Sequence, residues 1–400
     1  MICVDVSLER TIPPNAVDEV TYWLNFASEK ITKFDIKPDG GKSIKIWFDD
    51  SNSGASTDET EIVRKVQMCV DNVLDQHVLD TNEINVLNVF ENNKTLVDKK
   101  DFLKQVLSSN VVESLGLADI VIKDPLVTLV RAVDYTIRDL AKKFESQEYA
   151  YSNILPVNYL ESLHHFDTSP QNSMFITHMV PDSEVANQFI QETVKHNGII
   201  PKRDGFLSGT THALSPAVCY HVYLHLRNSV LKQDLMITTA GRNYRYEGQN
   251  AFLLERLWDF SAREIVFIGS PDFVRNTRSL LIEESQRILA EFELDGHIEN
   301  CNDALFLRGD SHKFDLDPNP KYELRLKLPY KDSHFSCGSF NVHGNIFGLR
   351  NNITNPQGDY LWSGCVAFGL ERWAWAIIAQ HGIDTTKWSN RLQKIFERYQ

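Results

Sequence analysis

The chain has 400 residues, of which 42% are hydrophobic and 10% aromatic, and its formal net charge is −13. The length exceeds that of one average domain and the composition suffices for packed cores, so we expect two domains, residues 1–150 and 151–400. The absence of an apolar run near the ~20 residues of a membrane span, and of a signal peptide in MICVDVSLER, argues against a membrane protein and predicts a cytoplasmic location.

Acidic residues dominate the N-terminal region. Residues 1–150 hold 17 Lys and Arg against 26 Asp and Glu, so about −9 of the net charge lies there. A domain that binds tRNA usually offers a basic face to the phosphates, and this composition therefore argues against tRNA as a partner. The six cysteines are widely spaced, which favours reduced thiols or metal ligands over a disulfide framework.

The N-terminal region is predicted to be an α+β unit. Alternating apolar residues predict strands over 1–9 and 43–48, and helical spacing predicts helices over 17–31 and 61–76. The segment SNSGASTDET (51–60) is a loop that can cap the second helix. No Asp-Ser-Leu phosphopantetheine site occurs here, which argues against a fused carrier domain. Residues 124–148 have a helical pattern and lead into the second domain.

The segment GRNYRYEGQNAFLLERLWDFSAREIVFIG (241–269) combines charged and aromatic side chains on two strand-like runs. Side chains two apart in a strand share a face, so Arg245 lies with Glu247, and Phe260 with Glu264. An arginine can neutralise a phosphate, an aromatic ring can stack on a purine, and a carboxylate can accept from the purine's amine. The alternative interpretation is an ordinary hairpin with a charged, exposed face.

This segment resembles motif 2 of the class II aminoacyl-tRNA synthetases, and GCVAFGLERWAWAIIAQHG (364–382) resembles motif 3. The resemblance implies a catalytic core over residues 151–400, built on a mostly antiparallel sheet flanked by helices. It implies catalytic roles for Arg245 in motif 2 and Arg372 in motif 3, which grip ATP from two sides. It also implies that Glu247, Arg256 and Phe260 bind ATP.

Within that class, residues 152–400 resemble the seryl-tRNA synthetase-like amino acid:[carrier protein] ligases and the atypical, zinc-dependent seryl-tRNA synthetases. This resemblance implies that Cys219, Glu264 and Cys365 bind zinc and that the amino group of the substrate completes the coordination. Two thiolates and a carboxylate suit tetrahedral Zn²⁺ with one open position. The alternative is that each cysteine is a small buried hydrophobe. His221 and His225 are interpreted as packing residues, with support of Cys219 as the alternative.

The chain departs from these relatives before the sequence Ser339-Phe340-Asn341. The relatives usually place there a glutamate that helps to hold Mg²⁺ on the ATP phosphates, whereas this chain has Phe335, Ser336 and Cys337. The absence of that carboxylate favours a degenerate or specialised enzyme.

Three functional hypotheses follow. The first is an ATP-dependent ligase that activates a small amino acid (glycine, alanine or serine) as the adenylate and transfers it to the phosphopantetheine thiol of a carrier protein. The second is aminoacylation of tRNA, which the N-terminal domain favours and its acidic charge opposes. The third is a synthetase-like binding module without catalysis. The segment Pro156–Leu163 resembles the surroundings of motif 1, which implies a homodimer.

Overall fold

The computed structural model describes residues 2–37, 39–48, 59–79, 85–91, 101–195, 205–301 and 314–400. They fall into two compact units, each assembled from separate stretches of the chain. Unit 1 contains Met1–Asn85, Ser114–Val121 and Glu247–Leu257. Unit 2 contains Val86–Glu113, Ile122–Tyr246 and Trp258–Gln400. The division into residues 1–150 and 151–400 stays a prediction, and most of the predicted capping loop, residues 51–58, lies outside the described residues.

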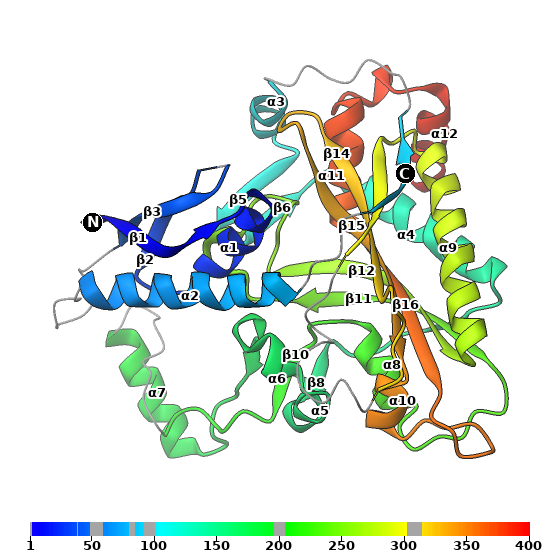
Figure 1. The fold of residues 1–400 in the computed structure, drawn as a ribbon, viewed down its shortest axis with the longest axis horizontal. Coiled ribbons are helices and arrows are strands. Elements are labelled where there is room, and N and C mark those ends of the chain that lie inside the picture. The colour runs from blue at the N-terminus through cyan, green and yellow to red at the C-terminus, as the bar shows by residue number, and fades with distance from the viewer. Residues whose placement is uncertain are drawn as a thin grey trace. The chain divides into compact units, whose positions relative to one another are not determined.

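Unit 1 contains a three-stranded antiparallel sheet in the order β1 (Ile2–Ile12), β3 (Gly41–Phe48), β2 (Ile31–Asp35). Two helices, α1 (Val17–Leu24) and α2 (Glu59–Leu79), pack with this sheet (Figure 1). The alternating residues Ile44, Ile46 and Phe48 are fully buried and form a core with Val66 and Val70 of α2. Every second side chain of β3 therefore points to the same face of the sheet and packs there with the buried face of α2 in one core.

The predicted strands and the second helix of this unit are confirmed, but the first helix is shorter than expected. Helix α1 ends at Leu24, with Asn25 as its C-cap, whereas the sequence pattern suggested a helix to Ile31. Ile31 instead begins strand β2, which the sequence did not predict. The burial of Ile31 against the sheet, rather than local propensity, accounts for this difference.

Unit 2 is built on an eight-stranded sheet in the order β4-β13-β14-β15-β16-β12-β11-β7. The strands are β4 (Val86–Phe90), β13 (Gly296–Asn300), β14 (Lys321–Leu328), β15 (Ser333–Gly344), β16 (Trp362–Gly369), β12 (Asp259–Gly269), β11 (Leu235–Tyr244) and β7 (Gln147–Tyr149). Every neighbouring pair is antiparallel except β11 and β7. The predicted α+β class with a mostly antiparallel sheet is confirmed.

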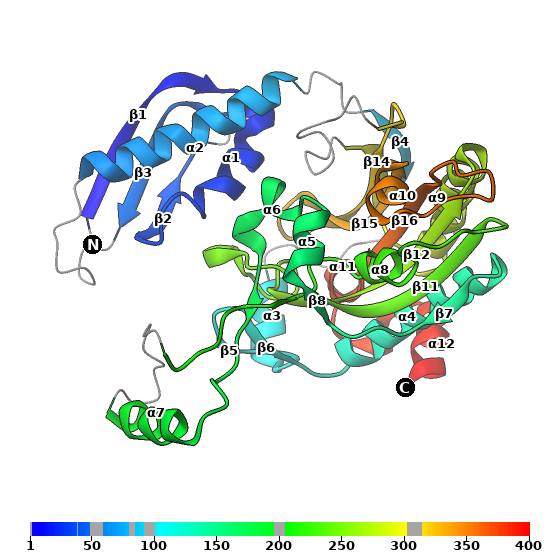
Figure 2. The same ribbon diagram turned by 90° about the horizontal axis from the view of Figure 1, so that it is seen from below.

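Helices α4 (Leu126–Lys143) and α11 (Leu370–His381) pack against one face of this sheet, and α12 (Asn390–Tyr399) packs against α4 (Figure 2). The almost fully buried Arg263 of β12 points to this face, where it forms ion pairs with Asp134 of α4 and with Glu148. Helix α9 (Pro271–Glu291) contacts β12, β15 and β16. Its apolar face is buried, at Val274, Leu281, Ile288 and the following residue Phe292.

The opposite face of β12 and β16 is partly covered by α8 (Cys219–His225), which packs with α10 (Ile346–Asn351). A small sheet of β8 (Ile154–Pro156), β10 (His212–Leu214) and β9 (Phe175–Ile176) belongs to the same unit. The remaining α-helices and strands are α3 (Phe102–Ser109), β5 (Val112–Gly116), β6 (Asp119–Ile122), α5 (Val157–Ser162), α6 (His165–Thr168) and α7 (Ser183–Lys195). None of the helices in the described stretches has the length and apolar character needed to cross a bilayer.

Candidate functional site

One row of directly paired residues crosses the large sheet on the face that α8 covers. Glu264 of β12 lies opposite Thr239 of β11 and Ala367 of β16. The row continues from Ala367 to Ser339 of β15 and Glu323 of β14. Directly opposed residues share a face, and so do residues two apart in one strand. Cys365, two residues before Ala367, therefore lies on the same face as Glu264, on the adjacent strand.

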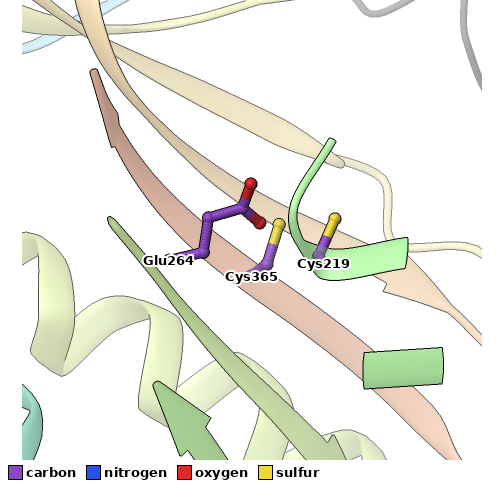
Figure 3. Close-up of side chains that lie close together, drawn as sticks. All are labelled: Cys219, Glu264 and Cys365. Atoms are coloured by element: carbon purple, nitrogen blue, oxygen red, sulfur yellow. The ribbon is translucent and has the colours of Figure 1, made fainter. Parts of the chain in front are cut away.

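A third side chain joins this pair from α8. Cys219 is the first residue of α8, and its sulfur, the sulfur of Cys365 and a carboxylate oxygen of Glu264 all lie within 4.8 Å of one another. The three buried side chains converge from two adjacent strands and a helix start (Figure 3). Among the residues with described placement, no other group of three or more His, Cys, Asp or Glu side chains has such an arrangement.

The electrostatics of this cluster favour a bound cation. Burial, followed by the negative charge of the Cys365 thiolate, raises the pKa of Glu264 to about 8. The Cys219 thiol donates a hydrogen bond to Cys365, which lowers the pKa of Cys365 and raises that of Cys219. Atom Oε2 of Glu264 is buried and has no hydrogen-bond partner in the described part of the chain. Two sulfurs and a carboxylate form a donor set that fits Zn²⁺, so these residues could hold it.

Several buried polar groups surround the sulfur of Cys365. Nδ2 of Asn341 lies 3.4 Å from this sulfur, and Nε2 of His343 lies 3.7 Å from it. Nδ1 of His343 is 3.1 Å from the Tyr223 hydroxyl and 3.3 Å from Oγ of Ser363. The sequence pattern did not reveal His343 or Tyr223 as site residues, because their proximity to Cys365 depends on pairing between distant segments.

Arg245 lies at the same face, just beyond the end of β11. Its backbone N–H donates to the Trp258 carbonyl, and its Nε donates to the Pro216 carbonyl at 3.1 Å. Its guanidinium carbon is 5.5 Å from the centre of the Phe260 ring. The positive charge of Arg245 limits the burial-driven rise in the pKa of Glu264, so this arginine acts on the carboxylate of the cluster. The exposed guanidinium of Arg245 thus lies close enough to the candidate metal centre to influence its carboxylate.

Arg372 enters from the junction of β16 and α11, as the motif 3 pattern predicts. Its Nη1 donates to the Ser336 carbonyl at 2.7 Å. The stretch Phe335–Cys337 lacks the carboxylate that the resemblance leads us to expect, but a carboxylate occurs on the neighbouring strand. Glu323, opposite Ser339, is ion-paired with Lys321 at 3.1 Å and with Arg325 at 3.2 Å. The face of the sheet that carries Ser336 therefore has a carboxylate, that of Glu323, which is ion-paired with two cationic side chains.

Glu247 and Arg256 belong to unit 1 and form an ion pair of their own. The prediction that a strand continues through Glu247 is wrong, because β11 ends at Tyr244 and Glu247 precedes the 3-10 turn Gly248–Asn250. Gly248 has a positive φ of 56°, which a strand does not accommodate. Oε2 of Glu247 lies 2.8 Å from Nη1 of Arg256. The remaining predicted ATP residues, Arg245, Phe260 and Arg372, lie in unit 2.

The two histidines of α8 are outside the metal cluster. The His221 ring stacks on Tyr151 with centroids 5.8 Å apart, and Nδ1 of His225 lies 3.0 Å from the Tyr151 hydroxyl. These contacts agree with the packing interpretation of both histidines.

Curated relatives of this chain are type-2 serine–tRNA ligases. The protein from Methanocaldococcus jannaschii is 28% identical over 281 residues, which are 68% of this chain and 54% of that protein. The protein from Methanopyrus kandleri is 26% identical over 308 residues, 72% of this chain and 58% of that protein. The chain thus spans about half the length of the curated relatives it matches. No protein-family model matches it.

Solved structures show the same fold. The seryl-tRNA synthetase of M. kandleri, in a complex with A. aeolicus tRNASec, superposes with a TM-score of 0.71 at 22% identity, covering 99% of this chain and 78% of that chain. The cytoplasmic serine–tRNA ligase of Naegleria fowleri, in a complex with AMP, gives a TM-score of 0.57 at 12% identity, covering 84% and 80%. These similarities support the predicted resemblance of the chain to the seryl-tRNA synthetase-like class II aminoacyl-tRNA synthetases.

The similarity to serine–tRNA ligases bears on the two expected acceptors, a carrier protein and tRNA. The carrier protein was the first hypothesis, but the relatives named above are serine–tRNA ligases and give it no support. One of the solved synthetases was captured with a tRNA.

Proposed function

We propose that this chain activates a small amino acid, serine in the first place, with ATP and transfers the aminoacyl group to tRNA. The observation that supports this most is the association of the Cys219–Glu264–Cys365 cluster with Arg245. A centre that can bind an amine next to a cation that can bind a phosphate or carboxylate fits amino-acid activation. The names of the relatives support tRNA as the acceptor and serine as the amino acid.

The proposed chemistry requires no side-chain nucleophile. The carboxylate of the amino acid attacks the α-phosphorus of ATP, the bond to the bridging oxygen breaks, and pyrophosphate leaves. Catalysis then consists of positioning and charge neutralisation, which we assign to Arg245 and Arg372, with Mg²⁺ accompanying the phosphates. Phe260 stacks on adenine, Glu247 accepts from its amine, and Arg256 contacts the outer phosphates. A terminal hydroxyl of tRNA then takes the aminoacyl group and releases AMP.

Cys219, Glu264 and Cys365 are the residues that would hold zinc. Bound there, zinc would supply an open position for an unprotonated amine and so discriminate amino acids from other carboxylates. Other side chains support these ligands. Asn341 and His343 contact the sulfur of Cys365, and Arg245 neutralises negative charge near Glu264. The resemblance to zinc-dependent synthetases favours a small substrate such as glycine, alanine or serine, because an amine bound to zinc leaves limited room.

Exchange of radioactive pyrophosphate into ATP, measured across the twenty amino acids, tests activation. We expect exchange that depends on one small amino acid, with serine the strongest. Absence of exchange with every amino acid would instead favour a binding module without catalysis.

Charging assays with tRNA and with a phosphopantetheinyl carrier protein then identify the acceptor. We expect charging of tRNA, and binding of tRNA that weakens steeply as salt is raised. Thioester formation on the carrier without charging of tRNA would restore the carrier hypothesis.

We also propose a homodimer, on the resemblance of Pro156–Leu163 to the motif 1 region. In unit 2 this segment forms the end of β8 and helix α5, with Tyr159 and Leu160 buried. Light scattering on the purified protein should give twice the chain mass of 45.9 kDa. A mass that stays at one chain over a wide concentration range would exclude the dimer.

A further inference from the structure

The loop Glu247–Leu257 packs within unit 1, against the C-terminal end of helix α1. A Cβ atom added to Gly248 would lie 3.4 Å from the Asn25 carbonyl oxygen and 3.8 Å from the Phe26 ring. Asn25 caps α1, and its Nδ2 donates to the Thr21 carbonyl at 2.7 Å. The first turn of the loop therefore lies close to the C-cap of α1.

The side chain of Arg256, at the other end of this loop, is held on two sides. Its Nη1 is 2.8 Å from Oε2 of the buried Glu247, and its guanidinium carbon is 5.5 Å from the centre of the Tyr22 ring on α1. Backbone hydrogen bonds in both directions between Phe252 and Arg256 close the loop, with N–O distances of 2.9 and 3.2 Å. The position of the guanidinium thus depends on α1 as well as on the loop.

The Tyr22 ring is itself fixed by neighbouring rings. Its centroid lies 5.6 Å from that of Trp23 and 5.4 Å from that of Phe26, both in edge-to-face geometry. Trp23 packs against the core that α1, α2 and the three-stranded sheet share. A chain of ring contacts therefore links the core of unit 1 to Arg256.

We propose that Tyr22 is a positioning residue that orients Arg256, so that helix α1 helps to prepare the loop for nucleotide. The packing part of this inference stands on the contacts above. The nucleotide part rests on the proposed function, because only that function assigns Arg256 and Glu247 to ATP. A cation over an aromatic ring contributes about 0.5–2 kcal/mol, which corresponds to a change of roughly twofold to thirtyfold in a binding constant.

The variants Tyr22→Ala and Tyr22→Phe separate the ring from the hydroxyl group. We expect Tyr22→Ala to raise the Kd and KM for ATP about threefold to tenfold, with the KM for the amino acid and the zinc content unchanged. Tyr22→Phe retains the ring and should stay close to the wild type. Trp47→Ala is the matched control, because it removes a ring that Lys33 and Lys45 contact at 4.9 and 5.5 Å elsewhere in unit 1.

A double-mutant cycle with Arg256→Ala decides whether Tyr22 acts through this arginine. If it does, Tyr22→Ala adds no further loss of ATP affinity in the Arg256→Ala background. An undiminished loss there would overturn the inference, as would Tyr22→Ala behaving as the wild type.

Hydrogen exchange of the amides in 248–256, measured without nucleotide, tests the packing independently of any activity. We expect faster exchange in Tyr22→Ala and unchanged exchange in Tyr22→Phe and Trp47→Ala. Equal acceleration in Trp47→Ala would overturn the inference by showing general loosening of unit 1. A wild type that binds no ATP would refute the proposed function, whereas the exchange result would still decide the contact between Tyr22 and the loop.

Discussion

The Nε2 atom of His343 faces the sulfur of Cys365 at 3.7 Å, and the opposite ring nitrogen of His343 is 3.1 Å from the Tyr223 hydroxyl. Tyr223 lies on α8, the helix that begins with Cys219. The imidazole thus connects one sulfur of the candidate metal centre to the helix that carries the other sulfur. Such contacts fix the orientation of a metal ligand, and their loss typically costs 10–100-fold in metal affinity.

His343→Gln should therefore weaken metal binding without removing a ligand. Titration with Co²⁺, followed through its thiolate absorption and by competition with a chelator, should show a loss of about tenfold to a hundredfold. His225→Gln is the control, since His225 contacts Tyr151 and lies outside the cluster. An unchanged Co²⁺ affinity in His343→Gln would show that the histidine merely fills space.

Cys219→Ser should remove the metal and the activity together. Elemental analysis is expected to fall from near one zinc per chain to near zero, and serine-dependent pyrophosphate exchange should fall at least about hundredfold, because the remaining two ligands hold zinc poorly. Cys3→Ser replaces an exposed cysteine and should change neither quantity. Full exchange activity in a zinc-free Cys219→Ser protein would separate the metal from catalysis.

Glu323 of β14 has a carboxylate that could contact Mg²⁺, whereas Ser336 on the neighbouring strand has none. It lies opposite Ser339, in the same cross-strand row as Glu264. We expect Glu323→Gln to raise the Mg²⁺ concentration needed for half-maximal exchange several-fold, because a hard cation prefers carboxylate oxygens. Glu299→Gln changes the next residue of the row, one strand further from Ser339, and should have the smaller effect. An equal Mg²⁺ dependence in wild type and Glu323→Gln would show that the requirement for Mg²⁺ comes from the nucleotide and not from Glu323.

The buried side chain of His165 predicts a pH dependence of the folding stability that does not involve a metal. Burial, together with the positive charge of Arg245, lowers the pKa of His165 from 6.5 to about 4. Between these values the unfolded chain holds more protons than the folded one, so stability falls as the pH drops from 6.5 to 4. This group accounts for at most about 3 kcal/mol of that loss.

The melting temperature as a function of pH checks this expectation. His165→Gln should flatten the decline between pH 6.5 and 4. An identical pH profile for wild type and His165→Gln would contradict the buried, neutral histidine.

Local sequence patterns predicted the elements that carry the site but not the contacts between them. The alternation around Phe260 and Glu264 and the Gly-rich entry to Arg372 are local signals, and β12, β16 and α11 follow them. Cys219 and Cys365 carry no such signal, because long stretches of chain separate them from Glu264. Only the resemblance to known synthetases singled them out, and the structure brings them together.

Other features escaped prediction because they depend on tertiary contacts. Strand β2 begins at Ile31, where burial in the sheet overrides a helical pattern. Glu247 leaves the strand because Gly248 adopts a left-handed conformation against α1. His343 is one of several polar residues in β15, and only its approach to Cys365 distinguishes it.

The segment Glu247–Leu257 lies in the second half of the sequence yet belongs structurally to the first compact unit. A truncated protein that starts at residue 151 would therefore keep this loop but lose helix α1, whose Tyr22 ring and Asn25 cap lie beside Arg256 and Gly248. Truncation at the predicted boundary after residue 150 would therefore remove contacts that the C-terminal part of the chain needs.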